Sequence, residues 1–440
     1  MTLPDYVRDC IDALEHAGFA AYVVGGCVRD ACLGLVPQDY DMCTSALPEQ
    51  TQAVFADRRL ILAGMRHGTV AVVTEGGIVE ITTFRTEGDY ADNRHPGWVK
   101  FVPDVEDDLA RRDFTVNAMA YSPTRGFADP FGGREDLKAN ILRAVGDPAA
   151  RFQEDSLRIL RGLRFSVRYG LTVEQDTLDA MFAQSHLMDN LARERVFDEL
   201  CKLLPLVTAQ DLCRFGPILA AVIPELAPMI GFDQHSRYHI HDLFTHTAHV
   251  TAALPPHPVL RWAGLLHDTG KIATFTMDDQ GNGHFYGHAE AGAAIADTVL
   301  RRLKAPNHLR EQVRFLIEAH MTLLTPERKI LRRRIARYGL ENVQLLLQLQ
   351  RADFGGKGTD EADPFGPIEE ALEAIRQEDA CLSLRDLAID GHDLMALGYT
   401  GRAIGTCLNR LLELVLDEQL PNEREALIHY LTISASEEHP

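Results

Sequence analysis

Hydrophobic and polar positions follow two different periods along the chain. Up to about residue 136, short apolar runs alternate with turn residues, and this pattern predicts strands. Helical patterns at Pro4–Ala17 and Val28–Leu33 interrupt the runs, so a mixed module of helices and strands is expected. The predicted strands are Phe19–Gly25, Asp39–Cys43, Thr69–Thr74, Ile78–Phe84, Val99–Val102 and Thr115–Tyr121.

Beyond residue 136 the apolar positions recur with the period of an amphipathic helix. No strand pattern of comparable strength occurs in that part of the sequence. We therefore predict an α+β head followed by an all-helical region. The predicted helices are Glu154–Tyr169, Glu174–Ala183, Arg193–Leu204, Ala289–Lys304, Leu309–Ala319, Ile368–Gln377 and Arg402–Asp417.

Composition narrows the class of protein. The chain has 440 residues, of which 46% are hydrophobic and 25% charged, and these values exclude a disordered chain or a collagen. Its net charge of −20 excludes a global basic field, so any RNA binding needs a local patch. The eight cysteines include no CxxC pair, which indicates reduced thiols. Without an apolar run of about 18 residues or a signal segment, we expect a cytoplasmic protein with no membrane span.

Two glycines mark the first candidate site. Gly25-Gly26 follows an apolar run and opens a helix, where backbone N–H groups can approach a phosphate closely. Arg29 adds a fork of hydrogen-bond donors for phosphate oxygens. The same residues also fit an ordinary tight turn between a strand and a helix.

Two carboxylates follow shortly afterwards. Asp39 and Asp41 share one face if they lie in a strand, and their mutual repulsion then favours a bound divalent cation such as Mg²⁺. A solvated loop is the alternative interpretation. In combination with the glycine turn, the pair favours metal-assisted phosphoryl transfer, in which metal ions orient a hydroxyl and stabilise the leaving pyrophosphate.

The segment GGCVRDACLGLVPQDYDMCT, which begins at Gly25, resembles the signature of the DNA polymerase β-like nucleotidyltransferases. More narrowly, it is similar to the family of class II tRNA nucleotidyltransferases and bacterial poly(A) polymerases. This resemblance implies a polymerase β-like head in which Asp39 and Asp41 are catalytic and hold Mg²⁺. It also implies that the 3′-hydroxyl of a tRNA attacks the α-phosphate of CTP twice and then that of ATP.

A second motif, DDLARRDFTVNAMAY (Asp107–Tyr121), resembles the family's ribose and phosphate motif. It implies that Gly26, Arg29 and Arg112 position the phosphates and ribose of the nucleotide. Asp113 would hold an arginine or a ribose hydroxyl. An exposed, salt-bridged loop is the alternative interpretation.

A third motif, QEDSLRILRGLRF, is similar to the family's base-reading helix. The resemblance implies that Asp155 and Arg158 pair with the base, while Arg161 and Arg164 support the helix and the triphosphate. Steps of three residues keep all four side chains near one side of a helix. A carboxylate accepts from the exocyclic amine of C or A, and arginine donates to ring acceptors. An ordinary surface helix with local ion pairs is the alternative.

The polar segment Thr83–Pro96 predicts a mobile loop. It resembles the flexible loop of enzymes that add the terminal A, which CC-only enzymes lack. The loop therefore implies complete CCA addition or A addition.

The helical half contains a second constellation of histidines and aspartates. Imidazoles and carboxylates suit Ni, Mn, Co, Fe or Zn, which can activate water for phosphoester hydrolysis. The order H…HD…H…H…D resembles the HD phosphohydrolases, and in tRNA nucleotidyltransferases it implies hydrolysis of 2′,3′-cyclic phosphate ends. Solvated or core histidines, or an inactive scaffold, are the alternatives. The residues are His246, His267, Asp268, His288, His320 and Asp353.

A basic cluster offers a local surface for RNA phosphates, although a solvated helix face explains it equally well. The cluster comprises Arg328, Lys329, Arg332, Arg333, Arg334 and Arg337.

We expect a head at 1–138, a neck with the base-reading helix at 139–230, an HD domain at 231–360 and a tRNA-binding body at 361–440. The expected partners are the tRNA 3′ acceptor end, CTP and ATP. The alternatives are a poly(A) polymerase, a CC-adding enzyme, or an HD phosphohydrolase with a non-catalytic RNA-binding head. The sequence leaves the oligomeric state and the mechanism of the C-to-A switch open.

Overall fold

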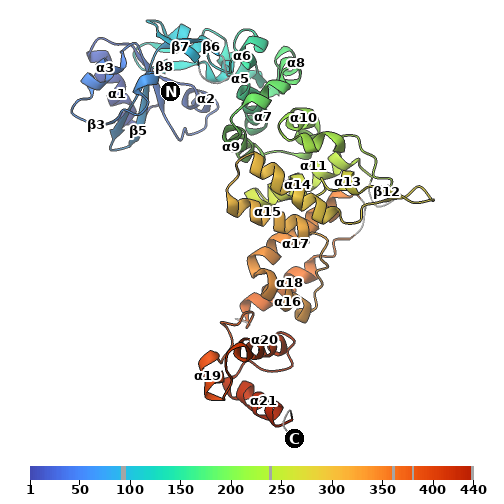
Figure 1. Cartoon of the computed structure of the whole chain (residues 1–440). Helices are drawn as coiled ribbons and strands as arrows, with labels where there is room; N and C mark the ends of the chain where they lie inside the picture. The colour runs from blue at the N-terminus through green and yellow to red at the C-terminus, as the bar shows by residue number, and fades with distance from the viewer. Residues whose placement is uncertain (91–95, 237–239, 359–361, 379–380, 438–440) are drawn as a thin grey trace. The chain divides into compact units, whose positions relative to one another are not determined.

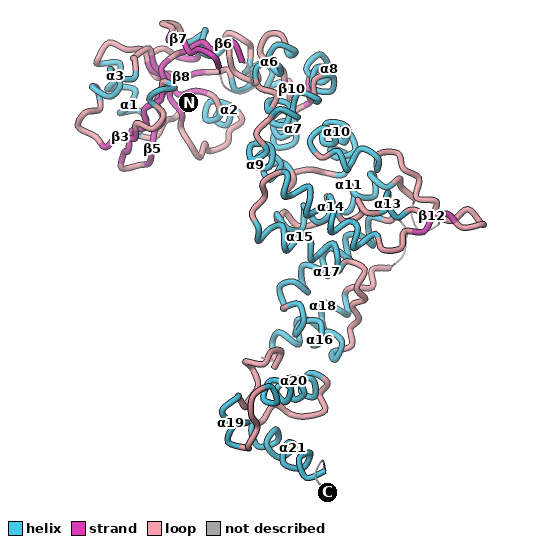
Figure 2. The backbone as a smooth tube through the Cα atoms, in the orientation of Figure 1, coloured by secondary structure: helices cyan, strands magenta, loops and turns pink. Residues whose placement is uncertain are grey.

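The computed structural model of the chain describes residues 1–90, 96–236, 240–358, 362–378 and 381–437. The chain divides into two compact units. The first unit is Met1–Ala227 with Arg302–Ala305, and the second is Pro228–Arg301 with Pro306–Pro440. Strands concentrate in the first unit and the second is mostly helical (Figure 2), so the predicted α+β head followed by a helical region is confirmed.

A seven-stranded sheet organises the beginning of the first unit (Figure 1), with strand order β3-β4-β5-β2-β1-β8-β9. Strands β2 and β5 run parallel, whereas the other pairs in this sheet are antiparallel. The strands are β1 (Ala21–Val24), β2 (Asp41–Thr44), β3 (Arg59–Ile61), β4 (Thr69–Thr74), β5 (Gly77–Thr83), β8 (Ala120–Ser122) and β9 (Gly126–Ala128). Two further pairs lie outside the sheet: β6 (Arg85–Tyr90) with β7 (Pro96–Phe101), and β10 (Ile141–Leu142) with β11 (Thr172–Val173).

Helices α1 and α2 pack against β1 and fix the start of the first unit. In α1, Val7, Ile11 and Leu14 are buried, because their spacing puts them on one face of the helix. The helices of this unit are α1 (Asp5–His16), α2 (Gly26–Cys32), α3 (Pro48–Val54), α4 (Val105–Ala110), α5 (Gly133–Lys138), α6 (Pro148–Glu154), α7 (Leu157–Tyr169), α8 (Gln175–Ala183), α9 (Arg193–Leu203) and α10 (Ala209–Val222). A core beside the sheet contains Tyr22, Val24, Cys43, Phe84, Leu109, Ala118, Ala120 and Val145.

The second unit is built from helices and one short antiparallel pair. Helix α17 contacts α11, α12 and α15, so segments distant in sequence meet around it. The elements are α11 (Leu243–Ala253), α12 (Pro258–Leu266), α13 (Lys271–Thr274), β12 (Thr276–Met277), β13 (Gly283–His284), α14 (His288–Arg302), α15 (Asn307–Ala319), α16 (Arg328–Tyr338), α17 (Leu340–Gly356), α18 (Gly366–Gln377), α19 (Gly391–Ala396), α20 (Arg402–Leu416) and α21 (Arg424–Glu437). Among the described residues, no helix is both long and apolar enough to span a membrane.

Two predicted strands begin later than the pattern indicated. Asp39 precedes β2, which starts at Asp41, so only Asp41 lies in the strand and Asp39 belongs to the preceding segment. The expected strand Thr115–Tyr121 opens with a 3₁₀ turn at Thr115–Asn117. Side-chain hydrogen bonds from Thr115 to Asp136 and from Asn117 to Asp113 stabilise this turn in place of a strand ladder.

The predicted helix Glu154–Tyr169 is broken. Helix α6 ends at Glu154 and α7 begins at Leu157. Between them Asp155 has extended backbone angles, and its carboxylate accepts a hydrogen bond from the Leu157 N–H at 3.1 Å. Asp155 therefore lies at the junction of two helices and not on the face of α7.

The segment predicted as a mobile loop contains ordered strands. Arg85–Tyr90 and Pro96–Phe101 pair as the β6–β7 hairpin, and residues 91–95 lie outside the described residues. Gly88 pairs with Trp98, and a Cβ at position 88 would lie 2.4 Å from the indole ring. The hairpin thus depends on a glycine opposite a large aromatic side chain, which a polarity pattern does not reveal.

Candidate functional site

The glycine turn lies beside an arginine from the second motif. Gly25 joins β1 to α2 with a φ of 75°, a backbone conformation that favours glycine. A Cβ at Gly25 would lie 2.9 Å from Nη1 of Arg112, so the absence of a side chain lets this guanidinium approach the turn. The structure therefore brings together the glycine turn and Arg112, which are far apart in the sequence.

Three carboxylates gather at the start of β2. Asp41 is the direct partner of Glu80 in the parallel pairing of β2 and β5. Desolvation, followed by the negative charge of Glu80, raises the pKa of Asp41; Asp39 raises it further and Arg112 lowers it. Carboxylate oxygens are ligands that Mg²⁺ prefers, so these side chains are the candidates to hold it. The sequence analysis missed Glu80, because only the register of two non-consecutive strands brings it to Asp41.

Arg29 is buried, and protein groups already occupy its donors. Nη1 lies 2.5 Å from Oδ1 of Asn117, Nη2 lies 2.5 Å from the hydroxyl of Tyr169, and Asp30 accepts from Nε and Nη2. The guanidinium also lies over the Tyr169 ring at 4.3 Å. Arg29 thus connects α2 to the end of α7.

The arginine motif is held by two buried aspartates. Asp108 accepts from Arg111 at 2.8 Å and from Arg112 at 3.2 Å. Asp113 accepts from Arg161 at 2.6 Å and from Asn117 at 3.0 Å. Burial alone would raise the pKa of Asp113, but Arg161 and Asn117 outweigh it and lower the value to about 2. These carboxylates orient the arginines within the first unit.

The proposed base readers also have partners inside the protein. Asp155 pairs with Arg195 at 2.8 Å, and Arg158 pairs with Glu154 at 2.7 Å. Arg158 further donates to the backbone oxygen of Arg111 at 2.8 Å.

Nearly two turns beyond Arg158 on α7, Arg164 forms a buried pair with Glu199 of α9 at 2.5 Å. Arg158, Arg161 and Arg164 follow one another at steps of three residues on α7, as the spacing predicted. Their ion pairs anchor α7 to three neighbouring segments.

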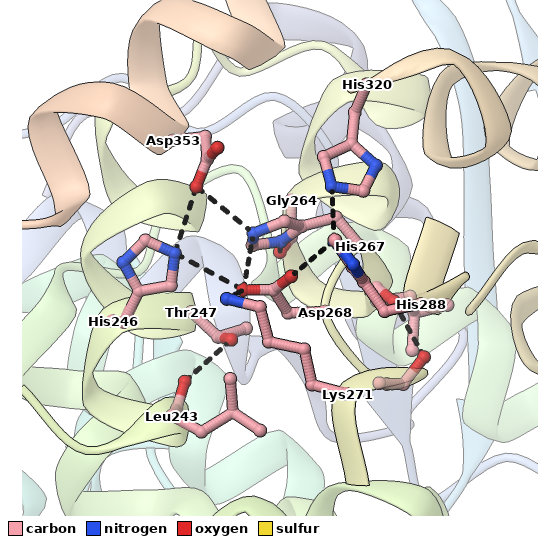
Figure 3. A network of polar contacts seen from close by, with 12 residues as sticks. Leu243, His246, Thr247, Gly264, His267, Asp268, Lys271, His288, His320 and Asp353 are labelled. Atoms are coloured by element: carbon pink, nitrogen blue, oxygen red, sulfur yellow. Dashed lines mark hydrogen bonds and ion pairs between the residues drawn. The ribbon is translucent and has the colours of Figure 1, made fainter. Parts of the chain in front are cut away.

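The second unit contains the histidine and aspartate constellation (Figure 3). His246 comes from α11, His267 and Asp268 follow α12, His288 begins α14, His320 follows α15 and Asp353 lies on α17. Two sets of side chains each have ligand atoms within 4.8 Å of one another, and Asp268 belongs to both. The sets are His246, His267, Asp268 and Asp353, and Asp268, His288 and His320. All six residues that the sequence singled out are therefore brought together.

Backbone carbonyls fix the orientation of three of these imidazoles. The Nδ1 atoms of His267, His288 and His320 lie 2.8, 2.8 and 2.6 Å from the carbonyl oxygens of Gly264, Phe285 and Ile317. A carbonyl oxygen only accepts, so each Nδ1 carries a proton and Nε2 is the ring atom that faces the cluster. This arrangement is typical of metal-binding histidines.

The short distance between two imidazole nitrogens also favours binding of metal cations in the cluster. The Nε2 atoms of His288 and His320 lie 3.1 Å apart, so their lone pairs would face each other without a proton or a cation between them. Burial alone would lower the pKa of His267, but Asp268 and Asp353 outweigh it and raise the value to about 10. Burial, followed by the charge of His267, lowers the pKa of His320 to about 4. Mixed imidazole and carboxylate donors in this buried setting fit first-row transition metals.

The basic cluster on α16 has acidic partners. Arg328 pairs with Glu378 at 2.5 Å and with Glu418 at 3.2 Å. Lys329 and Arg333 pair with Asp417, and Arg332 pairs with Glu418. Arg334 and Arg337 have no ion pair among the described residues. Acidic residues just after α18 and just after α20 thus pair with four of the six cations.

Family models match three parts of the chain. The "Poly A polymerase head domain" model matches residues 21–143, and the "Probable RNA and SrmB- binding site of polymerase A" model matches residues 170–230. The "tRNA nucleotidyltransferase domain 2" model matches residues 285–431.

The chain is similar to CCA-adding enzymes over nearly its whole length. It is 33% identical to the enzyme of Streptococcus mutans serotype c over 442 residues, which cover 98% of each chain. It is 33% identical to that of Geobacillus stearothermophilus over 428 residues, which cover 96% of this chain and 95% of the relative.

Solved structures extend the similarity to the fold. The Bacillus stearothermophilus CCA-adding enzyme in complex with CTP aligns with a TM-score of 0.74 and 28% identity, covering 100% of this chain and 99% of the other. The Thermotoga maritima CCA-adding enzyme complexed with tRNA has a TM-score of 0.62 at 19% identity, with 98% and 96% coverage, and shares the fold. The resemblance inferred from the motifs of the head is confirmed: this chain belongs to the family of CCA-adding enzymes and is a nucleotidyltransferase.

Proposed function

We propose that this chain adds C, C and A to the 3′ end of tRNA, using CTP and ATP, at the glycine turn and carboxylates of the first unit. The observation that carries the proposal is the meeting of Asp41, Glu80 and Arg112 beside Gly25. The names of its full-length relatives support the same reaction. We assign the head to residues 1–138 and the neck to residues 139–230.

Different residues of the head would bind the metal ion and the triphosphate during nucleotidyl transfer. Asp39 and Asp41 would hold Mg²⁺ with Glu80 beside them, and the bound cation would supply charge neutralisation at the reacting phosphates. The guanidinium of Arg112 and the backbone at Gly26 bind the triphosphate. The protein thereby orients the α-phosphate toward the 3′-hydroxyl of the RNA.

The neck selects the base. Asp155 accepts from an exocyclic amine and Arg158 donates to ring acceptors, so C and A fit the pair. A nucleotide must replace their contacts with Arg195 and Glu154. Arg29, Arg161 and Arg164 act behind these groups, because their pairs with Asn117, Asp113 and Glu199 hold α2 and α7 in register.

The body at 361–440 and the basic cluster on α16 would bind the tRNA. Phosphates would compete with Glu378, Asp417 and Glu418 for four of the cations. Arg334 and Arg337 complete the surface. Recognition of an RNA helix by shape requires no contact with base edges.

The test is addition to a tRNA transcript that ends at the discriminator base. With Mg²⁺, we expect two additions from CTP alone and a third only when ATP is also present. A long A ladder would instead indicate a poly(A) polymerase, and two additions without a third would indicate a CC-adding enzyme. Asp39→Ala with Asp41→Ala should reduce addition by roughly a thousandfold or more. Full activity of this folded variant would contradict the assignment.

A second activity is favoured by the six-residue cluster of the second unit. We propose that residues 231–360 form an HD-type phosphohydrolase that opens 2′,3′-cyclic phosphates at RNA ends. The cluster would hold one or two ions of Ni, Mn, Co, Fe or Zn, which would supply an activated water. Lys271, whose Nζ lies 2.8 Å from Asp268, would bind a substrate phosphate at the edge of the cluster.

Paired variants separate the two sites. His267→Ala with Asp268→Ala should abolish hydrolysis of a 2′,3′-cyclic phosphate and leave CCA addition within about twofold of wild type. The head variant Asp39→Ala with Asp41→Ala should lose CCA addition and retain hydrolysis of the 2′,3′-cyclic phosphate. Loss of both activities from either folded variant would contradict two independent sites, and absence of hydrolysis with every metal tested would remove the second activity.

A further inference from the structure

A cavity connects the histidine–aspartate cluster to an exposed aromatic pair. It has a volume of about 670 Å³, and Asp268, His288 and His320 line it together with His284 and Tyr286. The aromatic pair and the metal-ligand candidates are close in sequence, because only one residue separates Tyr286 from His288. A further contact fixes this segment, since His288 Nδ1 donates to the backbone oxygen of Phe285 at 2.8 Å.

The two aromatic rings form a flat surface. The rings of His284 and Tyr286 are stacked, with centroids 5.5 Å apart and planes inclined by 8°. Tyr286 is 79% exposed, which is unusual for a large aromatic side chain inside a polar cavity. Stacking uses one face of Tyr286 and leaves the other available.

The loop between β12 and β13 holds this surface in place. Asp278 accepts from His284 Nε2 at 3.0 Å and from the backbone N–H of Asn282 at 2.8 Å. Hydrogen bonds from the Asn282 side chain, the Asn282 backbone N–H and His284 lower the pKa of Asp278. The surface is therefore preorganised, which reduces the entropy that binding would cost.

We propose that His284 and Tyr286 are a base-stacking platform, which makes this site specific for a terminal nucleotide and not for a phosphate ester alone. A nucleotide carries its base and its 2′- or 3′-phosphate on one ribose, and the cavity likewise offers a flat aromatic surface beside a cluster that would bind phosphate. Every base has a π face, so the platform accepts the end of any RNA, and the larger purines stack more strongly on it. This inference rests on the proposed hydrolase activity and adds the residues that would recognise the base of its substrate.

Two substrates that differ only in the base test the platform. The full-length, metal-loaded protein is assayed with adenosine 2′,3′-cyclic phosphate and with the same ribose cyclic phosphate lacking the base. Tyr286→Ala should lower kcat/KM for the nucleotide about tenfold, mainly through KM, and leave the abasic substrate unchanged. Tyr286→Phe should retain wild-type values. Leu323→Ala is the control, since Leu323 is 73% exposed but does not line the cavity.

The outcomes separate this inference from the hydrolase itself. Equal effects of Tyr286→Ala on both substrates, or no effect on either, would overturn the platform while the hydrolase stands. If the wild type hydrolyses neither substrate with any metal, the hydrolase proposal fails. In that case, calorimetric titration of the wild type and of Tyr286→Ala with adenosine 2′-monophosphate tests the platform independently of hydrolysis. Weaker binding by the variant supports the platform, and identical isotherms for the two proteins overturn it.

Discussion

At the scale of single residues, buried carboxylates set the geometry of the head. Asp113 receives the backbone N–H of Phe114, the amide of Asn117 and the guanidinium of Arg161. One side chain thus ties the arginine motif to α7. Because its neighbours favour the charged form, this aspartate also stabilises the fold in a pH-dependent manner.

Asp113→Asn should destabilise the protein by about 2 kcal/mol at pH 7. The folded-state pKa of about 2 lies below the ordinary value of 3.8, so the carboxylate's contribution is complete above pH 4. It is lost as the pH falls toward 2, and the difference between variant and wild type should shrink there. Urea unfolding at several pH values measures this difference. Asp5→Asn, at a 92% exposed side chain, should change stability by less than about 0.5 kcal/mol.

At the scale of secondary-structure elements, turns and strand registers bring the chemistry together. Gly25 has a positive φ and adjoins Arg112, whereas Gly18 has a positive φ of 88° with no atom near its Cβ position. A comparison of the two glycines therefore distinguishes the effect of backbone strain from that of a clash with Arg112.

Gly25→Ala and Gly18→Ala should each destabilise the protein by roughly 1–2 kcal/mol, since both force alanine into a left-handed conformation. Only Gly25→Ala should lower CCA addition, by about tenfold or more, because its methyl group displaces Arg112. Thermal unfolding and single-nucleotide product analysis measure the two effects. Equal activity of the two variants would show that Arg112 does not need its position at the turn.

Helix α16 provides a second prediction. Asp417→Asn with Glu418→Gln should release Lys329, Arg332 and Arg333, tighten tRNA binding several-fold and steepen its salt dependence. Asp363→Asn with Glu369→Gln removes the same charge but releases Arg351 instead. Filter binding at two salt concentrations compares the variants. Equal tightening by both pairs would mean that net charge, and not the basic cluster, controls affinity.

Local patterns predicted those parts of the site that depend on neighbours in sequence. The glycine turn, Asp39 and Asp41, and the hairpin of β4 and β5 all follow from short-range signals. Glu80 could not be found in this way, because its position depends on parallel pairing between β2 and β5. The break at Asp155 follows from one side-chain cap, and the pairing of the α16 arginines depends on acidic residues just after α18 and just after α20.

At the scale of the whole molecule, the two candidate sites lie in different units. The carboxylates and the glycine turn belong to the first unit, and the histidine–aspartate cluster belongs wholly to the second. The order of the six ligands in the sequence resembles that of the HD phosphohydrolases, and this resemblance predicted that they share one site. Their convergence from α11, α12, α14, α15 and α17 depends on packing that no local period encodes.

Metal binding should stabilise the second unit measurably. A metal at one hundred times its Kd adds about 2.7 kcal/mol to the folded state, which corresponds to a rise in Tm of several degrees. Mn²⁺ or Ni²⁺ added after chelation should produce this rise in wild type but not in His267→Ala with Asp268→Ala. Differential scanning calorimetry records it without any assay of activity. A similar rise in that variant would locate the metal elsewhere.

The carbonyl groups that orient His267, His288 and His320 belong to the main chain. Substitution of the side chain of Phe285 or Ile317 keeps the carbonyl oxygen, so such changes do not remove the contacts that orient His288 and His320. An engineer who wished to change the preferred metal would therefore have to replace a ligand outright. During evolution, the substrate pocket could diverge while the coordination geometry stayed constant.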